Sequence, residues 1–284
     1  MNWYDYRDRH PHNTVTGTLK VYEALHSPQL GNNRDIFVAL PPGYDDTHRR
    51  YPVVYTHDGQ NLFDQHTSYA GEWQVDETLH TLHGEGLDAI VVGLPNMGND
   101  RIKEYSPFRS YRWGEGRADD YLRFIVHTVK PLVDQSFRTQ PDREHTGIMG
   151  SSMGGLVSLY GFFRFCDWFG FAGVMSPSLW FDGGAIFPFV LQSKHCSGMI
   201  YLDMGGRESP TGQGGMNYGL RNARRMQKLL QSKGYRADQN LLYVEDMEAG
   251  HTESAWAYRL PNALRFLLRP QPMHATLRLS IASS

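Results

Sequence analysis

Residues 145–165 read HTGIMGSSMGGLVSLYGFFRF, and this stretch decides the fold. A short strand is expected over His145–Met149 and a helix over Met153–Phe165. Between them, Gly150–Gly154 matches the pattern G-x-S-x-G with Ser152 at its centre. A chain that turns sharply from strand into helix has no room for a β-carbon two residues before or after the serine, which accounts for the glycines. The turn lifts the hydroxyl out of the sheet, so Ser152 is the predicted nucleophile.

Segments typical of strands alternate with segments typical of helices on both sides of this motif. The expected strands are Val15–Ser27, Asp35–Leu40, Tyr51–His57, Leu87–Gly93, His145–Met149, Gly170–Met175, Gly198–Met204 and Leu241–Glu245. The expected helices are Val75–Leu82, Ala118–Phe137, Met153–Phe165, Ile186–Gln192, Met216–Lys233 and Glu253–Leu268. We therefore predict an α/β fold, the α/β-hydrolase fold, with a mostly parallel sheet of about eight strands and helices on both faces.

The length of 284 residues is compatible with one domain or two. Because the expected strands form one continuous series, we predict a single α/β-hydrolase domain over residues 1–284. Residues 1–14 are expected to form an N-terminal arm, and residues 270–284 a peripheral tail. An apolar content of 40% and a charged content of 20% are those of an ordinary globular protein and exclude wholesale disorder.

The composition also limits the partners. Lys and Arg number 28 and Asp and Glu number 30, a net charge of −2, which gives no electrostatic footprint for nucleic acid. Residues 1–14 lack the apolar core of a signal peptide, and no segment approaches the ~18 apolar residues of a membrane span. We therefore predict a cytoplasmic protein with neither a nucleic-acid nor a membrane partner.

Two residue types that often bind metals are present, but not in metal-binding patterns. Cys166 and Cys196 are the only cysteines, and we expect two buried free thiols rather than a disulfide. His80 and His83 lack the glutamate and the third ligand of a zinc motif. No metal and no organic cofactor is expected.

A nucleophilic serine needs a base, and His251 is the best placed of the thirteen histidines. It follows the last expected strand and precedes the final helix. In a parallel sheet this position is at the carboxyl edge, on which Ser152 also lies. His57 also ends a strand, but it precedes the serine in the chain, which is the wrong order for this fold.

The acid of the triad should follow a strand and lie between these two residues in sequence. Glu208 follows the strand Gly198–Met204 and completes the order Ser152, Glu208, His251. Its role would be to fix the imidazole tautomer and to stabilise the imidazolium. Asp246 and Glu248, in the loop of His251 itself, are the alternatives.

Two backbone N–H groups are candidates for an oxyanion hole. The N–H of Met153 lies at the start of a helix and points toward the developing charge. The second donor should come from the loop after Tyr51–His57, where Gly59 permits a tight turn and Gln60 offers its N–H. A plain Asp-Gly turn without this role is the alternative.

With these residues in view, the chain resembles the Putative esterase family of the α/β-hydrolase superfamily, which includes esterase D-like enzymes, enterochelin esterases, feruloyl esterases and mycolyltransferases. The resemblance spans about residues 33–268. It is carried by His57–Phe63, Trp73 with Asp76, Val92-Gly93, Arg101 with Glu104-Tyr105, Gly150–Gly155, Ser176–Trp180, Gly206–Glu208, and His251 with Trp256. It implies Ser152 as nucleophile, His251 as base, Glu208 as acid, and Gln60 and Met153 as oxyanion donors. Family members often carry Asp where this chain has Glu208.

The expected activity is therefore hydrolysis of a small-molecule carboxylic ester through an acyl-enzyme. An acyltransferase using the same triad and a catalytically inactive binding module are the alternatives. Arg101 and Trp113 in the loop Pro95–Gly116, together with Trp180, are candidates for binding an aromatic or anionic acyl group. A solvated loop is the alternative for that segment.

Overall fold

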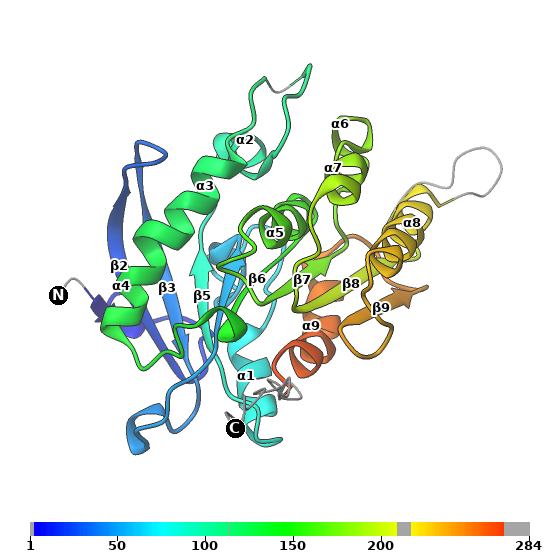
Figure 1. Cartoon of the computed structure of the whole chain (residues 1–284). Helices are drawn as coiled ribbons and strands as arrows, with labels where there is room; N and C mark the ends of the chain where they lie inside the picture. The colour runs from blue at the N-terminus through cyan, green and yellow to red at the C-terminus, as the bar shows by residue number, and fades with distance from the viewer. Residues whose placement is uncertain (1–2, 113, 209–216, 270–284) are drawn as a thin grey trace, which may run out of the picture.

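One mixed sheet runs through the computed structural model, which describes residues 3–112, 114–208 and 217–269 (Figure 1). Its strand order is β1-β2-β3-β5-β4-β6-β7-β8-β9. The pairs β1/β2, β2/β3 and β3/β5 are antiparallel, and the strands from β5 across to β9 are parallel. The strands are β1 Trp3–Asp5, β2 Thr18–Ser27, β3 Asn32–Leu40, β4 Val53–His57, β5 Ile90–Leu94, β6 Thr146–Ser151, β7 Phe171–Met175, β8 Met199–Gly205 and β9 Leu241–Asp246.

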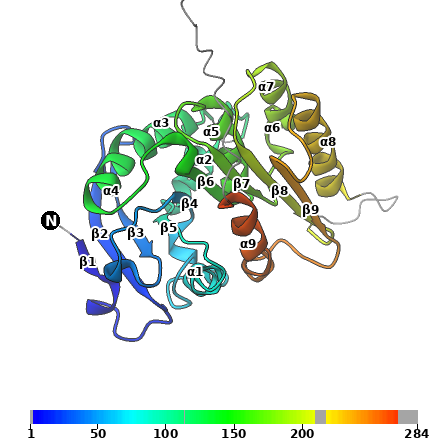
Figure 2. The ribbon, with the colours of Figure 1, turned by 60° about the horizontal axis from the view of Figure 1, so that its bottom comes forward.

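Helices cover both faces of the sheet. Helices α3, α4, α5, α7 and α8 lie on one face, and α1 and α9 pack together on the other (Figure 2). The helices are α1 Val75–His83, α2 Arg101–Tyr105, α3 Ala118–Phe124, α4 Lys130–Ser136, α5 Met153–Arg164, α6 Phe181–Gly184, α7 Ile186–Gln192, α8 Tyr218–Ser232 and α9 Glu253–Leu267, with a π-helical turn, η5, at Ile125–Val129.

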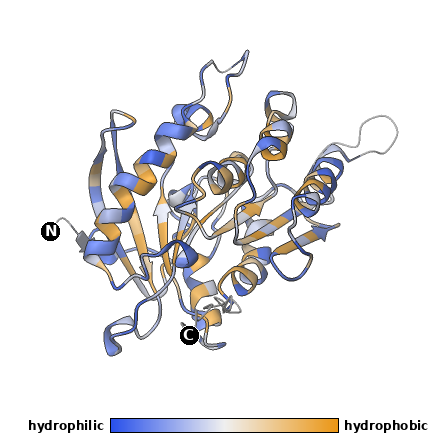
Figure 3. Cartoon of the chain, in the orientation of Figure 1, coloured by the Kyte–Doolittle hydropathy of each residue, from blue (hydrophilic) through white to orange (hydrophobic). Residues whose placement is uncertain are grey.

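The middle of the sheet is apolar because both of its faces are covered. Every residue of β4, β5, β6, β7 and β8 is buried, the pattern of parallel strands between two helical layers. In Figure 3 these strands are largely hydrophobic, whereas the helices carry both kinds of residue. On α8 the buried residues Leu220, Ala223, Met226 and Leu230 recur at helical spacing and turn toward the sheet.

The predicted α/β fold is confirmed, with three local differences. The sheet of the described residues has nine strands rather than about eight, because Trp3–Asp5 of the expected arm pairs with β2. The expected loop after β5 contains the short helix α2. The long helix expected over Ala118–Phe137 is divided into α3, η5 and α4. Pro131 lacks an N–H for the α-helical ladder, which explains why the hydrogen-bond pattern shifts just before it.

The expectation of two free thiols is wrong, because Cys166 and Cys196 form a disulfide. Their Cα atoms lie 5.8 Å apart although 30 positions separate them. Each cysteine shortly precedes a strand, and the starts of those strands, Phe171 and Met199, are paired in the sheet. Disulfides are uncommon in cytosolic proteins, and the cytoplasmic location stays a prediction.

Among the described residues, no helix combines the length and the apolar character that crossing a membrane requires. The order β6-β7-β8-β9 places the carboxyl ends of four parallel strands side by side. The loops that follow β6, β8 and β9 carry Ser152, Glu208 and His251. The fold therefore brings together at one edge three residues that are far apart in sequence.

Candidate active site

Ser152 occupies the turn between β6 and α5 in a strained backbone conformation, with φ 57° and ψ −120°. Positive φ is unfavourable for a residue with a β-carbon and persists only where the surroundings enforce it. Two backbone hydrogen bonds do so: the Ser152 N–H donates to Met175 O at 3.1 Å, and the Ser178 N–H donates to Ser152 O at 3.0 Å. The turn presents the Ser152 side chain at the carboxyl edge of the sheet.

The glycines around Ser152 are required by close contacts. A β-carbon at Gly150 would lie 2.8 Å from the His57 ring, and one at Gly155 would lie 2.7 Å from Met175 O. Both separations are too short for non-bonded atoms, so both positions exclude a side chain. At Gly154 the nearest atom is 3.3 Å away, a milder restriction than the sequence motif suggested.

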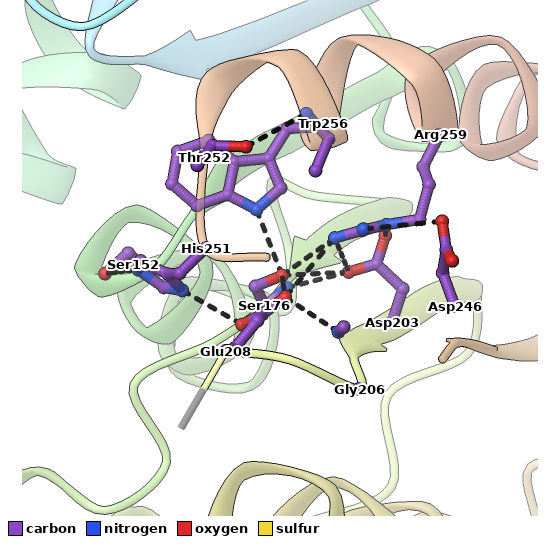
Figure 4. A network of polar contacts seen from close by, with 12 residues as sticks. Ser152, Ser176, Asp203, Gly206, Glu208, Asp246, His251, Thr252, Trp256 and Arg259 are labelled. Carbon is purple, nitrogen blue, oxygen red and sulfur yellow. Dashed lines mark hydrogen bonds and ion pairs between the residues drawn. The ribbon is translucent and has the colours of Figure 1, made fainter. Parts of the chain in front are cut away.

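A chain of hydrogen bonds joins Ser152, His251 and Glu208 (Figure 4). The Ser152 Oγ lies 3.0 Å from His251 Nε2, and His251 Nδ1 lies 2.9 Å from Glu208 Oε2. The Glu208 side chain is 3% exposed, whereas that of His251 is 40% exposed. A carboxylate at Nδ1 favours the tautomer with its proton there, which leaves Nε2 free to accept the serine proton.

The two alternative acids take other positions. Glu248 forms an exposed ion pair with Arg207. Asp246 Oδ2 lies 4.0 Å from Arg259 Nη1. Of the three candidates, Glu208 is the carboxylate recorded within hydrogen-bonding distance of His251.

Glu208 is itself held by donors on its second oxygen. Its Oε1 accepts hydrogen bonds from the Gly205 N–H at 2.7 Å and from the Ser176 hydroxyl at 2.5 Å. The Ser176 Oγ in turn accepts from Trp256 Nε1 at 3.0 Å and from Arg259 Nη2 at 2.9 Å. These two hydrogen bonds fix the rotamer of Glu208 and satisfy its Oε1, so that Oε2 is oriented toward His251.

A buried ion pair lies behind this arrangement. Arg259 Nε donates to Asp203 Oδ2 at 2.8 Å, and Asp203 also accepts from the Ser176 N–H at 2.8 Å and from the Tyr201 hydroxyl at 3.0 Å. Burial acts to lower the pKa of Arg259, but its ion pairs with Asp203 and Glu208 leave that pKa raised, so the guanidinium stays charged. The sequence analysis included Ser176 only among the residues of the family resemblance and gave it no role. It missed Arg259, because no local motif marks that residue.

His57, the other candidate base, is placed away from this chain. It is 1% exposed, its Nδ1 lies 2.8 Å from the Tyr121 hydroxyl, and its Nε2 is buried without a hydrogen-bond partner. Burial lowers the pKa of His57 to about 3, although the neighbouring Asp58 acts in the opposite direction. His57 is therefore a neutral packing residue beneath Gly150.

A cavity of about 1030 Å³ opens over Ser152 and His251. It is lined by Asp58, Gln60, Asn61, Thr67, Ser68, Tyr69, Ala70, Trp73, Asn96, Gly98, Asn99, Arg101, Ser151, Ser152, His251, Glu253 and Trp256. Its wall combines aromatic rings with amide side chains, a surface suited to an organic ligand that has both apolar and polar parts.

The two expected N–H donors lie near this cavity. Met153 is the first residue of α5, where N–H groups have no partner within the helix. Gln60 belongs to a short 3₁₀ helix, η3 Gly59–Asn61, and lines the cavity. The reason for Gly59 differs from the expected tight turn: a β-carbon there would lie 2.6 Å from the Leu94 backbone nitrogen.

The three residues predicted to bind the substrate differ in where they lie relative to the cavity. Arg101 lines the cavity, but its guanidinium is engaged by Asp58 through contacts of 2.7 and 2.8 Å. Trp180 is 65% exposed and does not belong to the cavity wall. Trp113 lies outside the described residues. The loop Pro95–Gly116 therefore contributes to the wall mainly through its first part.

Comparison with known proteins agrees with this architecture. The IroE-like serine hydrolase from Shewanella oneidensis superposes with a TM-score of 0.69 at 21% identity, covering 88% of this chain and 80% of that one. The enterobactin esterase FES from Shigella flexneri superposes with a TM-score of 0.68 at 17% identity, covering 89% of this chain and 59% of that one. The fold is thus the α/β-hydrolase fold.

The family follows from sequence. Residues 27–267 match the model of the family described as Putative esterase, and the chain belongs to that family. The uncharacterized protein YbbA of Bacillus subtilis is 24% identical over 248 residues, which is 85% of this chain and 95% of that protein. The predicted resemblance to this family is confirmed.

Proposed function

We propose that this protein is a serine carboxylic-ester hydrolase that works through an acyl-enzyme, with Ser152 as nucleophile, His251 as general base and Glu208 as the acid that orients it. The observation that carries the proposal is the continuous chain Ser152 Oγ–His251 Nε2–His251 Nδ1–Glu208 Oε2, with separations of 3.0 and 2.9 Å between side chains. Nucleophile, base and orienting acid in hydrogen-bond reach are the geometric requirement for this chemistry.

In the acylation step, the Ser152 oxygen bonds to the ester carbonyl carbon while its proton passes to His251 Nε2. The carbonyl electron pair moves onto the oxygen, where the N–H groups of Met153 and Gln60 stabilise the negative charge. When that electron pair returns, the bond to the alkoxy group breaks, and the imidazolium gives its proton to the departing alcohol.

In the deacylation step, His251 removes a proton from water, and the resulting hydroxide adds to the acyl carbon. Collapse of the second intermediate breaks the bond to Ser152, returns a proton to its oxygen and releases the carboxylic acid. Glu208 accepts the hydrogen bond from His251 Nδ1 throughout and stabilises the imidazolium.

The substrate we propose is a small-molecule ester. The cavity of about 1030 Å³ beside Ser152 has room for a ligand larger than a short acyl chain. Since Asp58 already neutralises Arg101, we place no anionic acyl group against that guanidinium. A match to a protein named as an enterobactin esterase is compatible with a bulky aromatic ester.

Two experiments test the proposal. The Ser152→Ala variant should lose at least ~10³-fold in kcat on p-nitrophenyl butyrate while its far-UV circular dichroism is unchanged. A fluorophosphonate probe should label Ser152 in the native protein but not label the variant. Full activity in the folded variant would disprove the role of Ser152, and a folded native protein that neither labels nor hydrolyses esters would favour a binding module.

The acceptor and the organisation of the chain remain part of the proposal. Water is the proposed acceptor, and product analysis with an added alcohol would reveal a transferase by its new ester. We also propose that residues 1–284 act as one domain, since the nine described strands belong to one sheet.

A further inference from the structure

Three acidic side chains converge at the start of α1, on the face of the sheet that carries α1 and α9. They belong to Glu72, Asp76 and Glu77, and one carboxylate oxygen of each lies within 4.8 Å of one from each of the others. Asp76 is 4% exposed, and Glu72 and Glu77 are half-buried. None of the three takes part in the proposed ester chemistry.

An oxygen of each carboxylate lacks a donor. Glu72 Oε1, Asp76 Oδ1 and Glu77 Oε2 are all buried without a hydrogen-bond partner. In contrast, the second oxygen of Asp76 accepts from the Thr16 N–H at 2.5 Å and from the Thr16 hydroxyl at 3.1 Å. A buried carboxylate oxygen normally has a donor or a cation, so three orphaned oxygens in one place indicate a missing positive charge.

The surrounding elements supply both signs of charge at greater distance. The ionisable side chains of these elements are Asp64 in the loop after β4, His80 and His83 on α1, Glu253, Tyr258, Arg259 and Arg265 on α9, and Glu245 and Asp246 at the end of β9. Arg259 and Arg265 are committed to Asp203 and Glu85. Neither arginine therefore neutralises the cluster.

We propose that Glu72, Asp76 and Glu77 form a binding site for a divalent cation of the calcium type. All the donors are oxygens, which hard cations prefer, and the set contains neither His nor Cys for zinc. Two oxygens that bind one Ca²⁺ at ~2.3–2.6 Å lie at most ~5 Å apart, and the oxygens here satisfy that limit. Glu77 also lines a surface cavity of about 800 Å³, which gives an ion a route from solvent.

The cation would join the N-terminal arm to the wall of the active-site cavity. Thr14 of the arm donates to Glu72, and Thr16, just after the arm, donates to Asp76. Glu72 precedes Trp73, which lines the cavity and packs against Trp256 with ring centroids 5.8 Å apart. The role of the ion is thus structural, and its binding does not depend on the proposed esterase activity.

Calorimetric titration of CaCl₂ into the full-length, chelator-treated protein at pH 8 tests the site directly. We expect one Ca²⁺ to bind and to raise Tm by at least ~3 °C at saturation, because a ligand bound only to the native state stabilises it. At pH 6 we expect the Kd to be at least ~10-fold weaker, because protons compete for the carboxylates.

Amide substitutions assign the ion to these residues. Asp76→Asn and Glu77→Gln keep the side-chain shape but remove charge, and both should abolish the binding heat and the Tm shift. Glu77→Gln, at a half-buried position, keeps the test valid if Asp76→Asn fails to fold. The control Glu144→Gln changes an exposed glutamate just before β6 and should bind Ca²⁺ like the native protein.

Three results would overturn the proposal. The first is that neither CaCl₂ nor MgCl₂ gives binding heat or a Tm shift in the native protein at pH 8. The second is that Glu77→Gln binds Ca²⁺ as tightly as the native protein does. The third is that the Tm of the native protein changes with pH but not with added Ca²⁺.

Discussion

Arg259 and Asp203 form a buried ion pair behind the His251–Glu208 hydrogen bond, with Arg259 Nε 2.8 Å from Asp203 Oδ2 (Figure 4). The two side chains are 4% and 0% exposed. Arg259 Nη2 also donates a hydrogen bond to the Ser176 hydroxyl, and this hydroxyl in turn donates to Glu208 Oε1. The pair therefore ties α9 and β8 to the loop that carries the proposed acid.

The Arg259→Met variant should be strongly destabilised. Removing the guanidinium leaves Asp203 as an uncompensated buried charge, and breaking a buried pair in this way costs about 3–5 kcal/mol. Urea unfolding at pH 7 measures the loss. The matched control is Arg265→Met on the same helix, where the arginine pairs with Glu85 at the surface. That variant should change the free energy of unfolding far less, and equal losses in the two variants would contradict the structural role of the buried pair.

Ser176→Ala should lower kcat about tenfold and leave KM unchanged. The substitution removes the hydroxyl that donates to Glu208, while Ser176 does not line the cavity. It also deprives Trp256 and Arg259 of an acceptor, which should cost about 1–3 kcal/mol of stability. Steady-state kinetics on an activated ester separates kcat from KM.

A second buried serine provides the control for this positioning role. Ser158 lies within α5 and donates to Gly154 O at 2.8 Å without contact to Glu208. Ser158→Ala should therefore keep the native kcat. If both alanine variants lose kcat equally, or if Ser176→Ala retains full kcat, then Ser176 has no specific part in positioning Glu208.

The sequence predicted most of what depends on local pattern or on strand order. The turn at Ser152 was predictable because the close contacts at Gly150 and Gly155 require glycine at both positions, and these glycines are visible in the sequence. Glu208 and His251 were predictable because carboxyl ends of parallel strands share an edge. The structure brings all three side chains together.

What the sequence did not reveal depends on packing between distant segments. Arg259 is one of several basic residues on amphipathic helices, and only the fold shows that it points at Asp203. The strand Trp3–Asp5 is too short to have a recognisable period. The Cys166–Cys196 disulfide depends on the pairing of β7 with β8 and has no local signal.

His57 should make the native protein less stable as the pH falls. Its pKa of about 3 in the folded protein lies below the ~6.5 of an unfolded chain, so between these values the unfolded state binds more protons. Stability therefore rises with pH across this window, is complete above pH ~6.5, and is lost on acidification by up to ~1.4 kcal/mol per pH unit from this residue.

The His57→Gln variant isolates this contribution from that of the acidic groups. Between pH 7 and pH 5 it should lose about 2 kcal/mol less stability than the native protein, because glutamine takes up no proton. Urea unfolding at intermediate pH values measures the difference. Parallel pH dependences in the two proteins would show that His57 is accessible to protons in the folded state.

The Cys166–Cys196 disulfide should stabilise the protein by about 3–4 kcal/mol, the value expected for a cross-link that closes a loop of this length. The double variant Cys166→Ser/Cys196→Ser, and the native protein in dithiothreitol, should both unfold at lower urea concentration than the oxidised protein. Dithiothreitol should not affect the double variant, which controls for other effects of the reductant. Thiol titration of the denatured, unreduced protein should find no free thiol, because the chain has only these two cysteines. Two titratable thiols would restore the sequence-based expectation of free cysteines and would also favour the predicted cytoplasmic location, since reducing compartments keep such pairs open.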